Sequence, residues 1–141
     1  MGNRPLAGRI RTETDMKYAL LIYSAPGAAD EAAPVDPSVD DGVMDNWIDY
    51  THALKDTGAV LGAEQLHPTD SATTVRLRGG DRLLTDGPFI ETKEHLLGFY
   101  LLDVADLDAA IEWAARMPLI RYGTVEVRPV AEGRPWQAVM G

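Results

Sequence analysis

The sequence predicts a single α+β domain built from an antiparallel sheet and two helices. Short apolar runs rich in aromatic and branched residues, which are typical of strands, recur along the chain. Two longer segments repeat apolar residues at helical spacing, and a Gly79-Gly80 pair separates two extended runs. At 141 residues the chain is long enough to bury a hydrophobic core of its own.

The first half of the chain predicts a strand, a helix and a second strand. Residues 17–23, KYALLIY, form a short apolar run typical of a buried strand. A helix is expected over residues 40–57, because apolar side chains recur at helical spacing before Gly58, a common helix stop. The stripe consists of Met44, Trp47, Ile48, Thr51 and Leu54. Residues 59–66 predict the second strand.

A hairpin and a third strand follow. The hairpin is expected over residues 73–85, with its turn at the two glycines. An Asp-Gly-Pro-Phe corner comes next, and residues 96–104, LLGFYLLDV, are typical of a strand.

The last part of the chain predicts a second helix and a final strand. Asp106 is a suitable N-cap for a helix over residues 107–117, which Pro118 ends. The expected apolar stripe of this helix is Leu107, Ala110, Ile111 and Ala114. Residues 124–130 form a strand that should be an edge or terminal one, because Pro129 cannot donate a backbone hydrogen bond. The order of elements is the split β-α-β pattern of a ferredoxin-like domain, with a hairpin inserted in its middle.

Both faces of the expected sheet are apolar. Because successive strand residues face opposite sides, Tyr18, Leu20 and Ile22 oppose Ala19, Leu21 and Tyr23. Two helices cover only one face, and an uncovered apolar patch of this size is unusual in a soluble monomer. We therefore expect a second copy of the sheet to cover the other face in a two-fold homodimer. The alternative is that the hairpin, or the C-terminal tail with Trp136, folds back over it.

Composition and charge exclude several classes of function. A net charge of −9 argues against a nucleic-acid partner, and no apolar run approaches the ~20 residues of a membrane span. The absence of cysteine excludes disulfides and thiol chemistry and suits a cytoplasmic protein. Motifs for nucleotide binding, zinc proteolysis and serine hydrolysis are missing, so we predict no cofactor and no metal site.

Residues 1–15 differ in character from the rest of the chain. They lack the apolar segment of a secretory signal and are expected to be a disordered leader. A single domain is expected over residues 16–141.

Polar side chains are expected on the uncovered face of the sheet. Val125 and Val127 share one face of the last strand, so Glu126 and Arg128 share the other. If the valines pack on the helices, Glu126 and Arg128 point toward the cavity between two subunits, as Tyr23 does. Burial perturbs ionisable groups and often marks a functional site, so we predict that Tyr23, Glu126 and Arg128 bind a ligand. An ion pair that stabilises the dimer is the alternative interpretation.

The Asp-Gly-Pro-Phe corner has a structural and a functional interpretation. Structurally, the Asp86 carboxylate accepts a hydrogen bond from the amide of Gly87 or Phe89. Functionally, Asp86 is a general base or a ligand anchor at the mouth of the cavity.

A charged cluster, Glu91, Lys93, Glu94 and His95, follows the corner and is most simply a solvated surface. In the functional interpretation Glu91 and Lys93 lie at the cavity mouth, where Lys93 could clamp an anionic ligand.

The segment TDGPFIETKEHLLGFYLLDVADLDAAIEWAARMP, followed by GTVEVRPV, resembles the DGPF-type proteins of the YCII-related family. The opening MKYALLIY and the run ATTVRLRGGDRLLTDGPF are similar to it too, so the resemblance covers about residues 16–130. It implies a ferredoxin-like subunit that pairs into a dimeric α/β barrel. The short YCII-like branch is thought to use a His and Asp pair, but that His falls at or near Trp47, which cannot accept a proton. Leu97 stands where the family pattern usually has the first of two glycines.

Two functional hypotheses follow. In the first, a cytoplasmic homodimer binds a small polar or anionic ligand in its barrel cavity, and Asp86 supplies any acid–base chemistry. In the second, the chain is a non-enzymatic interaction module. Relatives of this type are often encoded with, or fused to, extracytoplasmic-function sigma factors, which suggests such a system as its partner.

Overall fold

The structure is a computed structural model that describes residues 15–25, 43–90, 92–133 and 138–139. Residues 1–14 of the expected leader, Glu91 and Trp136 therefore lie outside the described residues. Asp15, which we assigned to the leader, is buried directly before the first strand. The elements are β1 (Met16–Ser24), α2 (Val43–Thr57), β2 (Val60–Gln65), η1 (Thr69–Ser71), β3 (Thr73–Arg78), β4 (Asp81–Asp86), β5 (His95–Val104), α3 (Leu107–Ala115), η2 (Pro118–Arg121) and β6 (Thr124–Pro129).

The predicted α+β fold with two helices and antiparallel sheets is confirmed. A four-stranded sheet has the order β2-β5-β1-β6, and each adjacent pair is antiparallel. This order is compatible with the ferredoxin-like subunit that the order of elements predicted. β6 is an edge strand, as Pro129 indicated.

The core lies between the helices and one face of the sheet. Tyr18, Leu20 and Ile22 of β1 point into it, and Tyr100 and Leu102 of β5 meet them there. Each fully buried leucine contributes roughly 2 kcal/mol through removal of its side chain from water. The alternation predicted for β1 is confirmed, because Ala19, Leu21 and Tyr23 are only partly buried on the opposite face. We call that opposite face the open face.

The helical stripes are rotated relative to the prediction. In α2, Ile48 is 46% exposed, whereas Tyr50 and Leu54 are buried. In α3, Ala110 and Ala114 are buried as expected, but Leu107 and Ile111 are each 47% exposed. Neighbouring sets of residues along a helix have the same spacing. The spacing of apolar residues therefore did not identify which side of each helix is buried.

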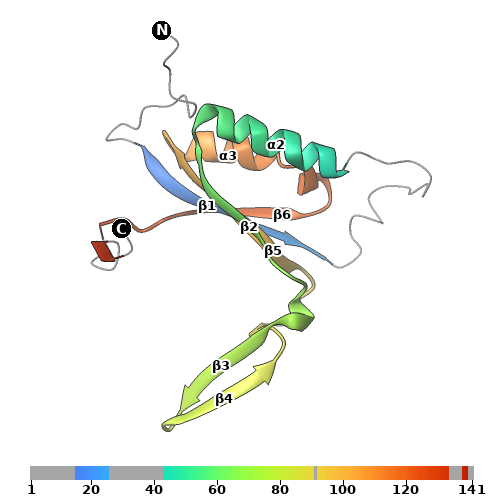
Figure 1. Cartoon of the computed structure of the whole chain (residues 1–141), viewed down its shortest axis with the longest axis vertical. Coiled ribbons are helices and arrows are strands. Elements are labelled where there is room, and N and C mark those ends of the chain that lie inside the picture. Colours follow the sequence, from blue (N-terminus) through green and yellow to red (C-terminus); the bar gives the residue numbers. More distant parts are fainter. Residues whose placement is uncertain (1–14, 26–42, 91, 134–137, 140–141) are drawn as a thin grey trace, which may run out of the picture.

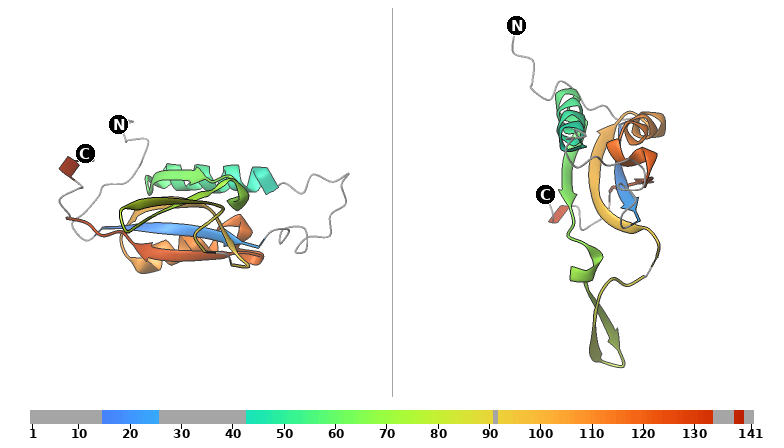
Figure 2. Two further views of the ribbon diagram at one scale, coloured as in Figure 1. Left: turned by 90° about the horizontal axis from the view of Figure 1, so that it is seen from below. Right: turned by 90° about the vertical axis from the view of Figure 1, so that its right-hand side faces the viewer.

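The predicted hairpin is confirmed, and it forms an arm rather than a cover. β3 and β4 pair only with each other, from Thr73↔Asp86 to Arg78↔Asp81, with Gly79 and Gly80 in the turn. This β3–β4 arm, residues 73–86, extends beyond the sheet on the side opposite the helices (Figures 1 and 2). The alternative in which the hairpin folds back over the open face is therefore wrong.

The corner after the arm is held by its backbone. Gly87 has a φ of 99°, a left-handed conformation that glycine adopts without strain. Its amide donates to the carbonyl of Ala72 at 2.7 Å, and its carbonyl accepts from the Thr74 hydroxyl at 2.8 Å. Of the two amides proposed as donors to the Asp86 carboxylate, Gly87 and Phe89, that of Gly87 therefore donates to Ala72 instead.

The absence of a side chain at Gly98 allows β2 to approach β5 closely. A Cβ at Gly98 would lie 2.5 Å from the carbonyl oxygen of Glu64 and 3.2 Å from the Cα of Gln65. Both are backbone atoms that cannot swing away, so a side chain would push the strands apart. We expect Gly98→Ala to lower the free energy of unfolding by about 1–3 kcal/mol, measured by urea denaturation.

Gly62 provides the matched control in the same strand pair. It lies opposite Leu101 on β5, and a Cβ there would meet nothing within 4 Å. Gly62→Ala should change stability by less than about 0.5 kcal/mol. Equal effects of the two substitutions would contradict the close approach as the cause.

Candidate functional site

The open face combines apolar and charged side chains in rows across the strands. Leu21 of β1 lies between Phe99 of β5 and Glu126 of β6. In the next row Ala19 lies between Leu101 and Arg128. In these two rows the charged residues of β6 border apolar residues of β1 and β5, and Glu64 of β2 lies on the other side of Phe99.

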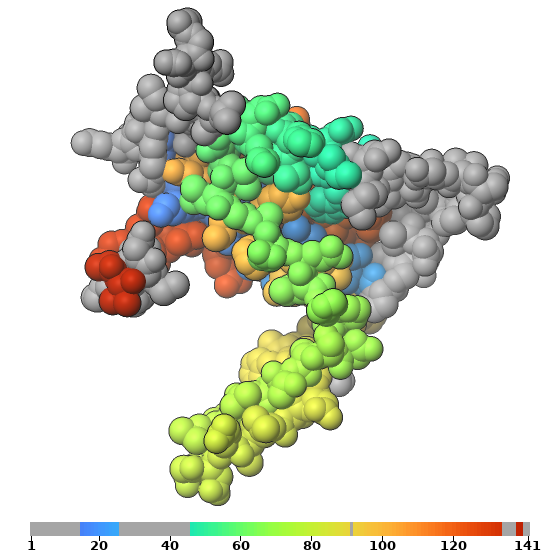
Figure 3. Space-filling view, viewed as in Figure 1, coloured from blue at the N-terminus to red at the C-terminus, as the bar shows by residue number. Residues whose placement is uncertain are grey.

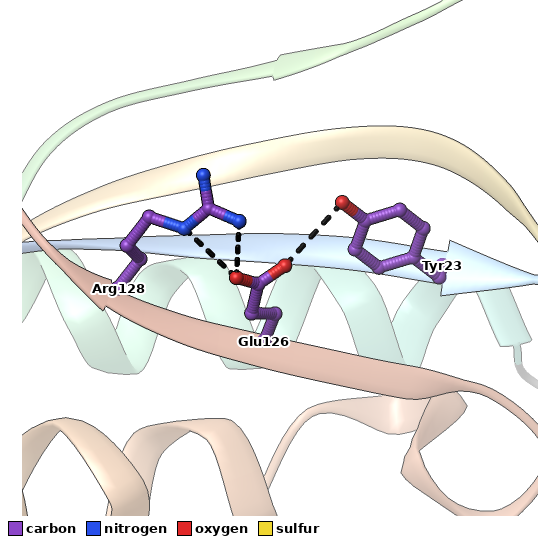
Figure 4. A network of polar contacts seen from close by, with 3 residues as sticks. All are labelled: Tyr23, Glu126 and Arg128. Atoms are coloured by element: carbon purple, nitrogen blue, oxygen red, sulfur yellow. Dashed lines mark hydrogen bonds and ion pairs between the residues drawn. The ribbon is translucent and has the colours of Figure 1, made fainter. Parts of the chain in front are cut away.

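Three of the predicted site residues meet on this face. The Tyr23 hydroxyl donates to Glu126 Oε1 at 3.5 Å, and Arg128 Nε donates to Glu126 Oε2 at 2.8 Å (Figure 4). A second guanidinium nitrogen, Nη2, contacts the same Oε2. Figure 4 shows all three side chains on the side of the sheet away from the helices. We call them the open-face cluster.

The open-face cluster is accessible to solvent in the single chain. The side chains of Arg128 and Glu126 are 63% and 38% exposed, and an ion pair at such exposure contributes little to stability, about 0–1 kcal/mol. Its formal charge is zero, since one carboxylate faces one guanidinium. Two nitrogens of Arg128 are engaged by Glu126, while the rest of the planar guanidinium keeps donors for another acceptor.

The other predicted site residues lie elsewhere. Asp86 is exposed at the end of β4, on the arm rather than on the main sheet. Lys93 is exposed in the segment between the arm and β5, and Glu91 lies outside the described residues. The structure therefore unites Tyr23, Glu126 and Arg128 but leaves Asp86 and Lys93 apart from them in one subunit.

A hydrogen bond that the sequence did not predict links the charged segment to the sheet. The Thr124 hydroxyl donates to Glu94 Oε1 at 3.2 Å, and Thr124 pairs with Tyr23 in the β1–β6 ladder. This contact joins residues that lie 30 positions apart, so no local pattern indicates it.

A pocket of about 450 Å³ lies where α2 and η2 meet the sheet. Six side chains from the helix-covered side line it: Ile22, Trp47, Thr51, Tyr100, Leu119 and Tyr122. Leu97, Gly98 and Phe99 of β5 and Ala63, Glu64 and Gln65 of β2 complete its lining. Trp47 and Thr51 belong to the apolar stripe of the predicted helix and Tyr100 to the predicted strand over residues 96–104, but no sequence pattern indicated that the three meet at a pocket.

The chain is similar to a known protein family and to a protein from another organism. The YCII-related domain matches residues 16–136, which is most of the chain. The chain belongs to the YCII-related domain family. It is similar to the uncharacterized protein R00369 of Rhizobium meliloti (strain 1021), with 35% identity over 122 residues that cover 85% of this chain and 96% of the relative.

No group of three or more potential metal ligands comes together in the part of the YCII-related domain that the structure describes. Among the same residues, no helix combines the length and apolar character that crossing a membrane requires.

Hydroxyl groups of the YCII-related domain form a network beside the pocket. The Thr51 hydroxyl donates to the Trp47 carbonyl at 2.9 Å and lies 2.8 Å from the Tyr100 hydroxyl. The Tyr50 hydroxyl donates to the Trp113 carbonyl at 2.7 Å, which joins α2 to α3. Burial raises the pKa of Tyr50 above its usual range; Tyr100 adds to this shift, and Arg116 opposes it. Tyr50 is therefore a neutral hydrogen-bond donor at physiological pH.

The raised pKa of Tyr50 predicts a loss of stability in alkali. The unfolded chain releases this proton near pH 10, before the folded chain does, so the stabilisation is complete below that pH and falls above it. The decline attributable to one such group is at most about 1.4 kcal/mol per pH unit. Urea unfolding across this range should show a shallower decline for Tyr50→Phe, which also costs about 1 kcal/mol at neutral pH. Parallel declines in the two proteins would contradict the prediction.

Proposed function

We propose that the YCII-related domain functions as a homodimer that binds a small polar or anionic ligand at its open face. The observation that carries the proposal is the open-face cluster within a sheet surface that the helices leave uncovered. Tyr23, Glu126 and Arg128 provide a hydroxyl, a carboxylate and a guanidinium within hydrogen-bonding distance of one another. A second subunit over this face would exclude water from the cluster and strengthen its electrostatic interactions with a ligand.

The apolar residues of the open face support pairing with a second copy. Phe99, Leu101 and Leu21 lie side by side and are only partly buried in one chain. A symmetric dimer would cover the same patch on both subunits and remove this apolar surface from water.

The arm offers a second apolar surface that borders the same space. Val75, Leu77 and Leu84 share one face of the hairpin and are 60%, 66% and 64% exposed. In the space-filling view the arm stands apart from the body, on the side of the sheet that the helices do not cover (Figures 1 and 3). A partner seated on the open face would therefore lie within reach of the arm. A two-stranded hairpin is marginally stable alone, so such a contact would stabilise it.

Charge also favours a second copy as the occupant of this space. Residues 73–86 contain three arginines and two aspartates, a net charge of +1, so the total of −9 leaves −10 on the remainder of the chain. The positive charge of the arm would be attracted to the negative charge on the body of the partner subunit. In a two-fold dimer this contact occurs twice.

The dimer is tested by placing a charge on the open face. Leu101→Glu would bury a carboxylate between the subunits, so we expect a folded monomer by sedimentation equilibrium and circular dichroism. Ile111→Glu on α3, an apolar residue outside both proposed contacts, should leave the dimer intact. A wild-type protein that is monomeric at all concentrations would contradict the proposal.

Variants of the arm keep the dimer testable if Leu101→Glu fails to fold. Leu84 and Leu83 are adjacent but face opposite sides of the hairpin, and only Leu84 shares a face with Val75 and Leu77. Leu84→Ser should weaken dimerisation more than Leu83→Ser. The reverse order would show that the other face of the arm contacts the partner.

Ligand binding is tested by thermal shift against small anionic metabolites, inorganic phosphate and citrate included. A compound at 100 times its Kd stabilises the fold by about 2.7 kcal/mol, a readily measured rise in Tm. We expect Arg128→Gln to lose the response, whereas Lys55→Gln, which removes a charge in the last turn of α2, keeps it. Equal responses of the two variants would place the ligand elsewhere.

The Asp86→Asn variant tests whether the arm contributes to the ligand site. Because Asp86 is exposed, the variant should remain a folded dimer. Loss of the ligand response supports a role for this carboxylate in binding or as a general base. An unchanged response confines the site to the sheet. The alternative partner, an extracytoplasmic-function sigma factor system, stays a prediction from the family resemblance.

A further inference from the structure

We infer that the pocket between α2 and the sheet is a second ligand site, for a planar, uncharged apolar molecule that carries one hydrogen-bond donor. Six of the residues that line it come from the helix-covered side of the sheet, and the open-face cluster of Tyr23, Glu126 and Arg128, which projects from the other side, is not part of its lining. The inference therefore stands independently of the proposed function.

The size and lining of the pocket match those of small-molecule sites. Its volume of about 450 Å³ falls within the range of about 300–1,000 Å³ that is typical of pockets for small ligands. Sites for small molecules are concave and mostly apolar, with a few polar groups that orient the ligand. Here Ile22 and Leu119 supply buried apolar surface, and Trp47, Tyr100 and Tyr122 supply aromatic surface.

The aromatic geometry favours a flat ligand. The rings of Trp47 and Tyr100 are nearly parallel, with an interplanar angle of 8° and centroids 6.3 Å apart. A planar molecule can stack in an offset arrangement on rings that present parallel faces, an arrangement worth about 0.5–1.5 kcal/mol for an aromatic pair. Tyr50 meets both rings edge-on, at 84° and 90°, and so supports them from the core side.

The hydrogen-bond directions determine which polar group the ligand should carry. The Thr51 hydroxyl has one proton, which it donates to the Trp47 carbonyl. At the contact between Thr51 and Tyr100 the proton must therefore come from Tyr100. The Tyr100 oxygen then has a lone pair to offer and no proton, so a ligand hydroxyl or N–H that donates to it is favoured.

Charge excludes an anionic ligand from this pocket. Glu64 is the sole ionisable carboxylate among the residues that line it, and no lysine, arginine or histidine accompanies it there. A carboxylate ligand would lose its hydration without gaining a cationic partner. This preference is opposite to that proposed for the open face.

Three probes of the same ring system test the inference by isothermal titration calorimetry at neutral pH. They are 2-naphthol, which donates a hydrogen bond, 2-methoxynaphthalene, which cannot, and the anion 2-naphthoate. Wild-type protein should bind 2-naphthol about fivefold more tightly than the methoxy compound, as one hydrogen bond predicts. 2-Naphthoate should bind most weakly. No detectable binding of 2-naphthol, or tighter binding of 2-naphthoate, would overturn the inference.

Two Tyr→Phe variants locate the site. Tyr100→Phe removes the acceptor, so the preference for 2-naphthol over 2-methoxynaphthalene should disappear while the methoxy compound binds as before. Tyr23→Phe makes the same change on the open face and should keep the preference. A preference that survives in Tyr100→Phe would overturn the assignment.

A third variant covers the case in which Tyr100→Phe does not fold. Thr51→Val removes the group that takes the Tyr100 proton, so the Tyr100 hydroxyl can donate as well as accept. The methoxy compound should then bind more tightly and the fivefold preference should shrink. An undiminished preference in Thr51→Val would contradict the hydrogen-bond directions on which the inference depends.

Discussion

The antiparallel pairing of β1 with β5 is the constraint on which the rest of the structure depends. These two strands form the centre of the sheet, and their register places Leu20 opposite Tyr100 and Leu21 opposite Phe99. Because side chains alternate along a strand, this register sends Leu20 and Tyr100 to the helices and Leu21 and Phe99 to the open face. A shift of one residue would exchange the two sets and place the leucine of the core in the solvent. The burial of the core therefore fixes the composition of the open face as well.

The same alternation separates the two candidate ligand sites, the pocket and the open-face cluster. Tyr100 joins the hydroxyl network under α2, while its neighbour Phe99 faces the other way. On β6, Val125 and Val127 pack against the core, which directs Glu126 and Arg128 to the open face. One sheet thus presents an aromatic pocket on one side and a charged cluster on the other. Ligands of opposite character can be accommodated because the sheet itself lies between them.

The strands and the hairpin could be predicted from the sequence, while the orientation of the helices could not. Alternation along a strand has a period of two, so a pattern such as that of residues 17–23 leaves two choices of face, and burial decides between them. A helix allows several neighbouring stripes with the same period, which is why Ile48 of α2 was assigned to the core in place of Tyr50. The cluster of Tyr23, Glu126 and Arg128 followed from strand alternation alone. The pocket could not be predicted in this way, because it depends on how α2 and η2 pack on the sheet.

Asp86 lies on the β3–β4 arm, a two-stranded sheet separate from the main one. Except for Thr74, the residues of this arm are exposed, and its two strands pair only with each other. Its base is tied down by backbone hydrogen bonds at Gly87, but its apolar face has no counterpart among the described residues. In the proposed dimer the partner supplies that counterpart, so the interface would stabilise the arm and its Asp-Gly-Pro-Phe corner. In that proposed dimer, any chemistry that needs Asp86 would depend on assembly of the two subunits.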